Sequence, residues 1–112
     1  MSQLINGSDV IFHKRNAEEN TSNEEASIGW AVNDVYPNAL PCGFGRLHDA
    51  ECPIKQLDYD EVLYLISGEL EIQINGQSHQ AKAGDVFNLK NGDQVKYIGK
   101  QAVFFFVTSP TY

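Results

Sequence analysis

The chain has 112 residues and a mass of 12.5 kDa, enough for one hydrophobic core but too little for two. Hydrophobic residues make up 42% and charged residues 21% of it, which is typical of a folded globular domain and excludes a disordered or fibrous chain. Its formal charge of −7 would repel phosphate backbones and anionic lipids, so we expect neither nucleic acid nor a membrane as a partner.

The beginning of the chain and its cysteines favour a cytoplasmic protein. No apolar run approaches the roughly 20 residues needed to cross a bilayer, and residues 1–7 lack the charged-then-apolar pattern of a secretory signal. Cys42 and Cys52 are the only cysteines and are not in CxxC spacing, so we expect a reduced pair rather than a disulfide scaffold.

Two short apolar segments, residues 10–12 and 28–32, are each bounded by Asn, Asp or Ser and predict the first two strands. Between them, residues 14–27 hold four Glu, three Asn and no large apolar side chain, which indicates a solvated loop or arm. We therefore divide the chain into an N-terminal strand with an acidic loop or arm, residues 1–27, and a β-barrel, residues 28–112. The sequence leaves open whether the loop folds over the barrel as a lid.

From residue 43 onward, short apolar runs alternate with Gly, Pro and Asn-Gly at the spacing of an all-β sandwich or barrel. Residues 61–66 (EVLYLI) are apolar on both faces after the glutamate, which predicts a strand covered on both sides. Further strands are expected at residues 70–74, 77–82, 86–89 and 103–107, with a two-residue turn at Asn75-Gly76.

Two segments, residues 60–70 (DEVLYLISGEL) and 83–92 (AGDVFNLKNG), resemble the two motifs of the cupin superfamily. The end of the first motif, a glutamate, six residues and a glycine, is met by Glu61 and Gly68. The second motif opens with Gly-Asp-Val at residues 84–86 and reaches a turn that ends at Gly92. The resemblance implies an all-β, single-domain cupin of the RmlC-like kind, a double-stranded β-helix or jelly-roll barrel.

Metal-binding cupins take two histidines from an HxH before this glutamate and a third from the second motif. With the family's spacing, these positions hold Lys55 and Leu57, or Ile54 and Gln56, and then Val95. Only Glu61 remains of the four ligands, and the nearby Lys55 ammonium would repel a cation. We therefore expect no metal at this site and no other cofactor.

Within the superfamily, residues 42–53 (CGFGRLHDAECP) and 57–61 (LDYDE) are similar to the ethanolamine-utilisation EutQ family. That family also lacks the HxH histidines and has a Tyr-Asp-Glu at this point. The resemblance implies a role in ethanolamine catabolism associated with bacterial microcompartments, and an acetate kinase activity. EutQ proteins commonly carry an extra N-terminal region, for which we expect this chain to be too short.

Strand alternation places Glu61, Leu63 and Leu65 on one face, which in the cupin pattern looks into the barrel. An ionised carboxylate there needs a proton, a hydrogen-bonded partner or a ligand, because burying it alone is costly. We expect Lys55 to be that partner. The pair is either structural, grips a substrate carboxylate through the lysine, or transfers a proton, and we favour the first two roles.

Residues around this strand add further candidates for the pocket. Tyr59 and Asp60 precede it at the expected barrel rim, where loops often carry binding groups, with rim packing and turn formation as the structural alternatives. Trp30, the only tryptophan, either stacks on a planar ligand or packs in the core or an interface. His48 lies in the pocket or on the surface. The full predicted ligand-binding set is Lys55, Glu61, Tyr59, Asp60, His48, Arg46, Trp30 and Tyr97.

Three functions fit these residues. The first is a metal-free cupin that binds a small polar or carboxylate metabolite in its barrel, in an accessory or metabolic role. The second is an enzyme acting on a small carboxylate or acyl phosphate, with Asp60 and Glu61 holding magnesium, although the sequence lacks a Gly-rich phosphate loop followed by lysine. The third is a metalloenzyme that uses a set such as His48, Glu61 and Cys52. Magnesium is expected only under the second function.

The three consecutive phenylalanines at residues 104–106 bear on assembly. Neighbouring side chains of a strand point to opposite faces, so at least one ring faces away from the barrel interior and needs cover. We therefore expect a homodimer.

Overall fold

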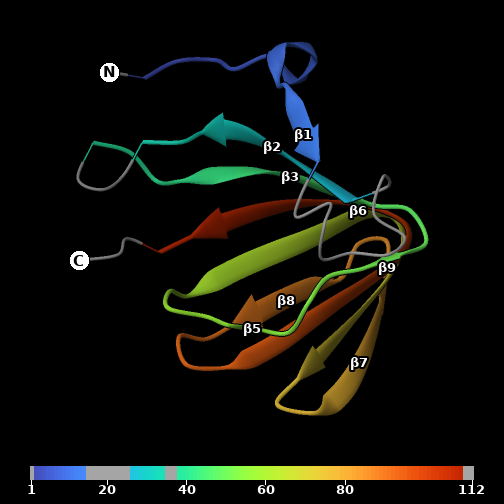
Figure 1. Ribbon diagram of the computed structural model, residues 1–112. Helices are drawn as coiled ribbons and strands as arrows, with labels where there is room; N and C mark the ends of the chain where they lie inside the picture. Colours follow the sequence, from blue (N-terminus) through green and yellow to red (C-terminus); the bar gives the residue numbers. More distant parts are fainter. Residues whose placement is uncertain (1, 15–25, 35–37, 110–112) are drawn as a thin grey trace.

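The computed structural model describes residues 2–14, 26–34 and 38–109, which form an all-β fold with one short 3-10 helix, η1 (Gly7–Asp9). In chain order the strands are β1 (Phe12–Lys14), β2 (Ala26–Val32), β3 (Cys42–Leu47), β4 (Ala50–Glu51), β5 (Lys55–Gln56), β6 (Glu61–Ile74), β7 (Gln77–Lys82), β8 (Val86–Leu89) and β9 (Gln94–Thr108) (Figure 1). None of the helices in these ranges is long and apolar enough to cross a membrane.

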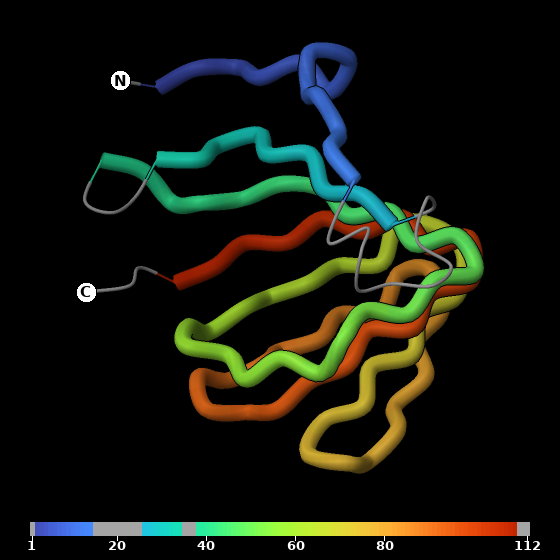
Figure 2. Tube along the Cα trace, viewed as in Figure 1, coloured from blue at the N-terminus to red at the C-terminus, as the bar shows by residue number. Residues whose placement is uncertain are grey.

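These strands join in one antiparallel sheet with the order β1-β2-β3-β9-β6-β7. The two long strands, β6 and β9, lie side by side and each changes its other partner along its length (Figure 2). β6 pairs first with β8 and then with β7, whereas β9 pairs first with β5 and β4 and then with β3. The sheet therefore curls into the predicted cupin barrel, with β1 to β3 at one side and the β6–β7 hairpin at the other (Figure 1).

The two long strands bend together at one point. The β6–β9 register shifts on either side of Ser67, where Gly68 has φ +83° and Gln101 has φ +51°. A Cβ on Gly68 would collide with the carbonyl oxygen of Gln101, so only glycine fits. The prediction that residues 61–66 and 70–74 form separate strands is therefore wrong, because the glycine bends one continuous strand instead of ending it.

The predicted strand at residues 103–107 is only the last part of the longer β9, whereas the other predicted strands agree with the structure more closely. β7 and β8 have the predicted bounds, and the turn at Asn75-Gly76 joins β6 to β7 with both residues at positive φ. β1 starts two residues later than predicted, at Phe12. Most of the acidic stretch, residues 15–25, lies outside the described residues, so the boundary at residues 27 and 28 and the lid remain predictions.

Two turns of the same sequence pattern close the β7–β8 and β8–β9 connections. In each, an aspartate N–H donates to a lysine carbonyl three residues earlier, and the aspartate carboxylate accepts from that lysine's N–H. These turns are Lys82 to Asp85 and Lys90 to Asp93. Asp85 is thus a turn residue, which agrees with its place in the second cupin motif.

The core lies on the concave side of the sheet. Leu63 and Leu65 of β6 are fully buried, and Phe104 and Phe106 of β9 pack with them. On the opposite face of β6, Val62, Tyr64 and Ile66 are 49%, 44% and 42% exposed. The prediction that this strand is covered on both sides is therefore wrong for the single chain, which covers only the inner face.

Candidate functional site

The barrel holds a cavity of about 480 Å³ between β2, the loop that precedes β6, and β9. Five aromatic side chains line it: Trp30, Tyr59, Tyr97, Phe104 and Phe106. Its polar lining residues are Ser27, Asn33, Lys55, Asp58, Glu61 and Thr108, and its remaining residues are Ile28, Pro41, Leu47 and Cys52. The cavity thus has apolar, mainly aromatic walls with a few polar groups, as is usual for a small-molecule site.

Glycines on β3 make room for the aromatic rings. Gly43 pairs with Trp30 on one side and with Phe106 on the other, and these two rings meet edge to face with centroids 5.2 Å apart. A Cβ on Gly45 would collide with the Phe104 ring, so that ring occupies the place where a side chain of β3 would otherwise be. Aromatic rings from β2 and β9 therefore cover the inner face of β3.

Lys55 and Tyr59 form the first polar pair of the cavity. The lysine Nζ donates a hydrogen bond to the tyrosine Oη at 2.7 Å and lies 4.9 Å from the centre of the ring. Both side chains are half-buried and line the cavity. Because the tyrosine oxygen accepts this bond, its own hydroxyl hydrogen remains available to donate.

Glu61 and Tyr97 form the second polar pair. The tyrosine Oη donates to Oε1 of the glutamate at 2.7 Å, and the residues are 6% and 7% exposed. The inward direction predicted for Glu61 is confirmed by its burial beside Leu63. The partner predicted for Glu61 is wrong, since Lys55 lies on a separate loop strand and donates to Tyr59 instead.

The structure brings together five of the eight predicted pocket residues, namely Lys55, Tyr59, Glu61, Trp30 and Tyr97. Ligand binding by these five remains a prediction.

Asp60 is placed outside the cavity, in its alternative role as a turn former. Its Oδ1 accepts a hydrogen bond from the Asn91 N–H at 2.8 Å, and its own N–H donates to Ser109 Oγ at 2.8 Å. The residue ties the beginning of β6 to the β8–β9 turn and to the end of β9. Its neighbour Glu61 points inward, because successive residues of a strand face opposite sides.

Arg46 and His48 also lie outside the cavity lining. Arg46 alternates with the inward Gly45 and Leu47 on β3, so it faces outward, with its guanidinium carbon 3.6 Å from the centre of the Phe12 ring. His48 lies half-buried in the bend between β3 and β4. The set of His48, Glu61 and Cys52 is accordingly not brought together.

Thr108 and Asn33 line the cavity but are absent from the predicted set. Thr108 pairs with Glu61 across β9 and β6, and the alternation that makes residues 104 and 106 inward extends to it. That pattern was sufficient to find Thr108. Asn33 follows β2 in an irregular segment, where alternation gives no direction.

The cupin metal positions carry side chains that do not suit a metal ion. Lys55 pairs with Val95 across β5 and β9, and Leu57 and Val95 are 1% and 0% exposed. The ammonium and two aliphatic side chains at these positions supply neither an imidazole nor a thiolate. Across residues 2–14, 26–34 and 38–109, no three His, Cys, Asp or Glu side chains gather in a way that would hold a metal.

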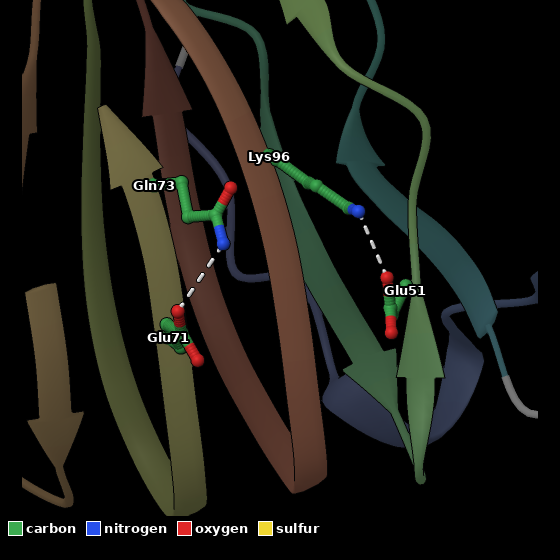
Figure 3. A network of polar contacts seen from close by, with 4 residues as sticks. All are labelled: Glu51, Glu71, Gln73 and Lys96. Atoms are coloured by element: carbon green, nitrogen blue, oxygen red, sulfur yellow. Dashed lines mark hydrogen bonds and ion pairs between the residues drawn. The ribbon is translucent and has the colours of Figure 1, made fainter. Parts of the chain in front are cut away.

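A second hollow, of about 320 Å³, is lined by residues of β4, β6, β7 and β9, several of them charged. Close to it, Lys96 forms an ion pair with Glu51 at 2.9 Å, and Gln73 donates to Glu71 at 3.4 Å (Figure 3). Ser78 also donates to Glu71, at 2.6 Å. These polar groups bond to one another at the surface of the molecule, whereas the two tyrosine pairs lie in the cavity.

Comparison with known proteins agrees with this architecture. A family model described as ethanolamine utilisation protein EutQ matches residues 10–112. The chain is 32% identical over 74 residues to an acetate kinase EutQ of Escherichia coli K12, a match that covers 65% of this chain and 31% of that protein. It therefore spans about a third of the length of that relative.

Solved structures extend the agreement to nearly the whole chain. An ethanolamine utilization protein Q of Salmonella typhimurium LT2 superposes with a TM-score of 0.76 at 26% identity, covering 97% of this chain and 86% of that one. An RmlC-like cupin of Shewanella frigidimarina gives a TM-score of 0.77 at 14% identity, covering 99% and 93%, and supports the fold alone.

Proposed function

The chain belongs to the EutQ family of cupins, and we propose that it binds a small polar or carboxylate metabolite in its barrel, without a metal, in an accessory or metabolic role. One observation carries the proposal: a cavity of about 480 Å³ that combines aromatic walls with a half-buried lysine and a buried glutamate. This volume lies in the range of about 300–1,000 Å³ that small-molecule sites occupy.

The charges of the lining support a polar ligand. Among the described residues that line the cavity, Lys55 is the only cationic side chain, and Glu61 and Asp58 are the carboxylates. Because Tyr59 accepts one N–H of Lys55, the ammonium is held toward the cavity with further N–H groups to donate. A ligand that accepts these bonds gains a charge-assisted contact in a place partly removed from water.

A metabolite screen tests the proposal on the intact chain. We would measure thermal shift and the fluorescence of Trp30, which is the only tryptophan and lines the cavity. Lys55→Ala should weaken binding of a hit that accepts hydrogen bonds, and Glu61→Ala that of a hit that donates them, each at least about tenfold, since each variant removes the polar group that such a ligand contacts. Lys96→Ala, on the outside of the barrel, is the matched control. Unchanged affinity in both cavity variants would place the site elsewhere.

The second candidate function is a magnesium-dependent acetate kinase activity, favoured by the name of the E. coli relative. It requires a magnesium site, for which Asp60 and Glu61 are the carboxylates in question. Asp60 is engaged by the Asn91 N–H on the outside, which weighs against a shared ion. Magnesium-dependent formation of acetyl phosphate from acetate and ATP, lost in Glu61→Gln, would establish the activity. Absence of turnover over a range of magnesium concentrations would leave the binding function.

We also propose a cytoplasmic homodimer. Cys42 and Cys52 are the only cysteines of the sequence and are not in CxxC spacing, which fits a reducing compartment. The outer face of β6 and β8 exposes Val62, Tyr64 and Val86 by 49%, 44% and 60%, and an apolar sheet face of this kind is suited to pairing with a second copy.

A further inference from the structure

We infer that the cavity selects a monocarboxylic acid with a flat, apolar ring, its carboxylate on Lys55 and Tyr59 and its ring against Trp30 and Phe106. The inference rests on the proposed function and deepens it, since it names the chemical class of the ligand.

The Lys55–Tyr59 pair is a donor site. The lysine has three N–H groups, of which one points at the tyrosine oxygen 2.7 Å away. The tyrosine oxygen accepts that bond, which leaves its hydrogen to donate. These two donors, one of them charged, lie 2.7 Å apart and match the two oxygens of a carboxylate, whereas the lysine charge repels an ammonium ligand placed at this pair.

The aromatic walls favour a flat ring. Trp30 and Phe106 meet edge to face across Gly43, so the two ring planes form a corner, with an interplanar angle of 83°. Because Trp30 is 38% exposed and Phe106 only 4%, a flat ring placed in this corner stacks mainly on the Trp30 plane, in a geometry that aromatic pairs prefer. A puckered ring of equal size makes this contact less well.

The remaining charges limit the ligand to one negative charge. The described lining has Lys55 as its cation against Glu61 and Asp58, and Glu61 is only 6% exposed. A carboxylate on Lys55 compensates the ammonium, but a second negative charge would face Glu61 in a site poorly screened by water. Dicarboxylates and phosphate esters are therefore selected against.

A ligand series on the wild-type chain tests these three features with Trp30 fluorescence and calorimetry as readouts. The probes are benzoate, cyclohexanecarboxylate (puckered ring), benzylamine (cation), terephthalate (dianion) and acetate (no ring). Benzoate should bind at least about tenfold more tightly than each of the others, since each loses one stacking contact, one charge pairing or gains one repulsion. Lys55→Met should lower benzoate affinity at least about tenfold while Lys96→Met leaves it unchanged.

The outcomes separate this inference from the function it rests on. Benzylamine or terephthalate binding more tightly than benzoate, or cyclohexanecarboxylate binding equally well, would overturn the inferred ligand class and leave metabolite binding in place. An unrelated metabolite as the only ligand would do the same. If no compound of a broad set of polar and carboxylate metabolites binds the folded wild-type chain, the proposed function itself fails. The ligand series needs no variant, so its result does not depend on how Lys55→Met folds.

Discussion

The inner and outer faces of β6 carry equally apolar side chains in very different surroundings. Leu63 and Leu65 on the inner face are fully buried, whereas Val62 and Tyr64 on the outer face are 49% and 44% exposed. The curl of the sheet closes over one face only, so composition alone does not decide burial. An apolar strand can therefore mark two contacts, one made within the chain and one that we propose is made with a second copy.

The outer face extends beyond β6. Phe44 pairs with Phe105 across β3 and β9, Phe105 pairs with Tyr64, and Tyr64 pairs with Val86 of β8. The two phenylalanine rings lie 5.4 Å apart at an angle of 60°. One row of apolar side chains thus crosses four strands, and the dimer that we propose would bury it.

Truncation of the inner face has the largest expected effect. Leu63→Ala should lower the free energy of unfolding by about 3 kcal/mol, because it removes buried methyl groups and leaves a cavity in a closed core. Denaturant unfolding at fixed protein concentration measures the loss. Val62→Ala, one residue away on the outer face, is the matched control, and it should cost less than about 1 kcal/mol in the Tyr64→Glu background, which should keep the chain monomeric. Equal losses would mean that the two faces are equally covered in solution.

A charge on the outer face should break the dimer. Analytical ultracentrifugation of the wild-type chain should give twice the chain mass of 12.5 kDa, and Tyr64→Glu should weaken association at least about a hundredfold by burying an unpaired charge. Gln77→Glu, on the exposed edge of β7, adds the same charge and should leave the mass unchanged. A monomeric wild-type chain, or a dimer that survives Tyr64→Glu, would contradict an interface on this face.

The two faces also show how far the sequence predicts the fold. The cupin motifs predicted the barrel, and the turn at Asn75-Gly76 and the apolar run at residues 86–89 predicted two strands to the residue. Gly68 was misinterpreted as a strand end because a glycine with positive φ occurs both in turns and at bends within strands. Which of the two it makes depends on β9, whose Gln101 carbonyl lies against it after folding.

The candidate site was likewise predicted only in part from the sequence. Motif spacing and alternation placed Lys55 and Glu61 in one cavity, since both depend on local geometry. The partner of each was not predictable, because it depends on where loops and distant strands bring Tyr59 and Tyr97. Arg46 was assigned to the pocket because the alternation of side chains between the two faces cannot be followed through the turns before β6. In the structure Arg46 lies on β3 and faces outward.

A polar contact of the inner face has an intermediate expected effect. Tyr97→Phe removes the hydroxyl that donates to buried Glu61 while keeping the ring, and should lower the free energy of unfolding by about 1–2 kcal/mol. Tyr59→Phe is the matched control and should cost less. It removes the hydroxyl that accepts from Lys55, but the ammonium of this half-buried lysine can be solvated by water instead. Thermal and denaturant unfolding measure both. A larger loss for Tyr59→Phe would mean that Lys55 depends on its tyrosine partner more than Glu61 does.

The surface ion pair between Lys96 and Glu51 has the smallest expected effect. Its side chains are 29% and 59% exposed, so water and salt screen the attraction that the 2.9 Å contact suggests. Lys96→Met should change the free energy of unfolding by less than about 0.5 kcal/mol, and a double-mutant cycle with Glu51→Gln should give a coupling of similar size that falls as salt is raised. Lys55, in contrast to Lys96, lies inside the barrel, where its removal should weaken ligand binding. A coupling above about 1 kcal/mol that does not change with salt would show that the exposed Lys96–Glu51 pair is as strong as a buried one. Burial would then no longer distinguish the charges on the two faces.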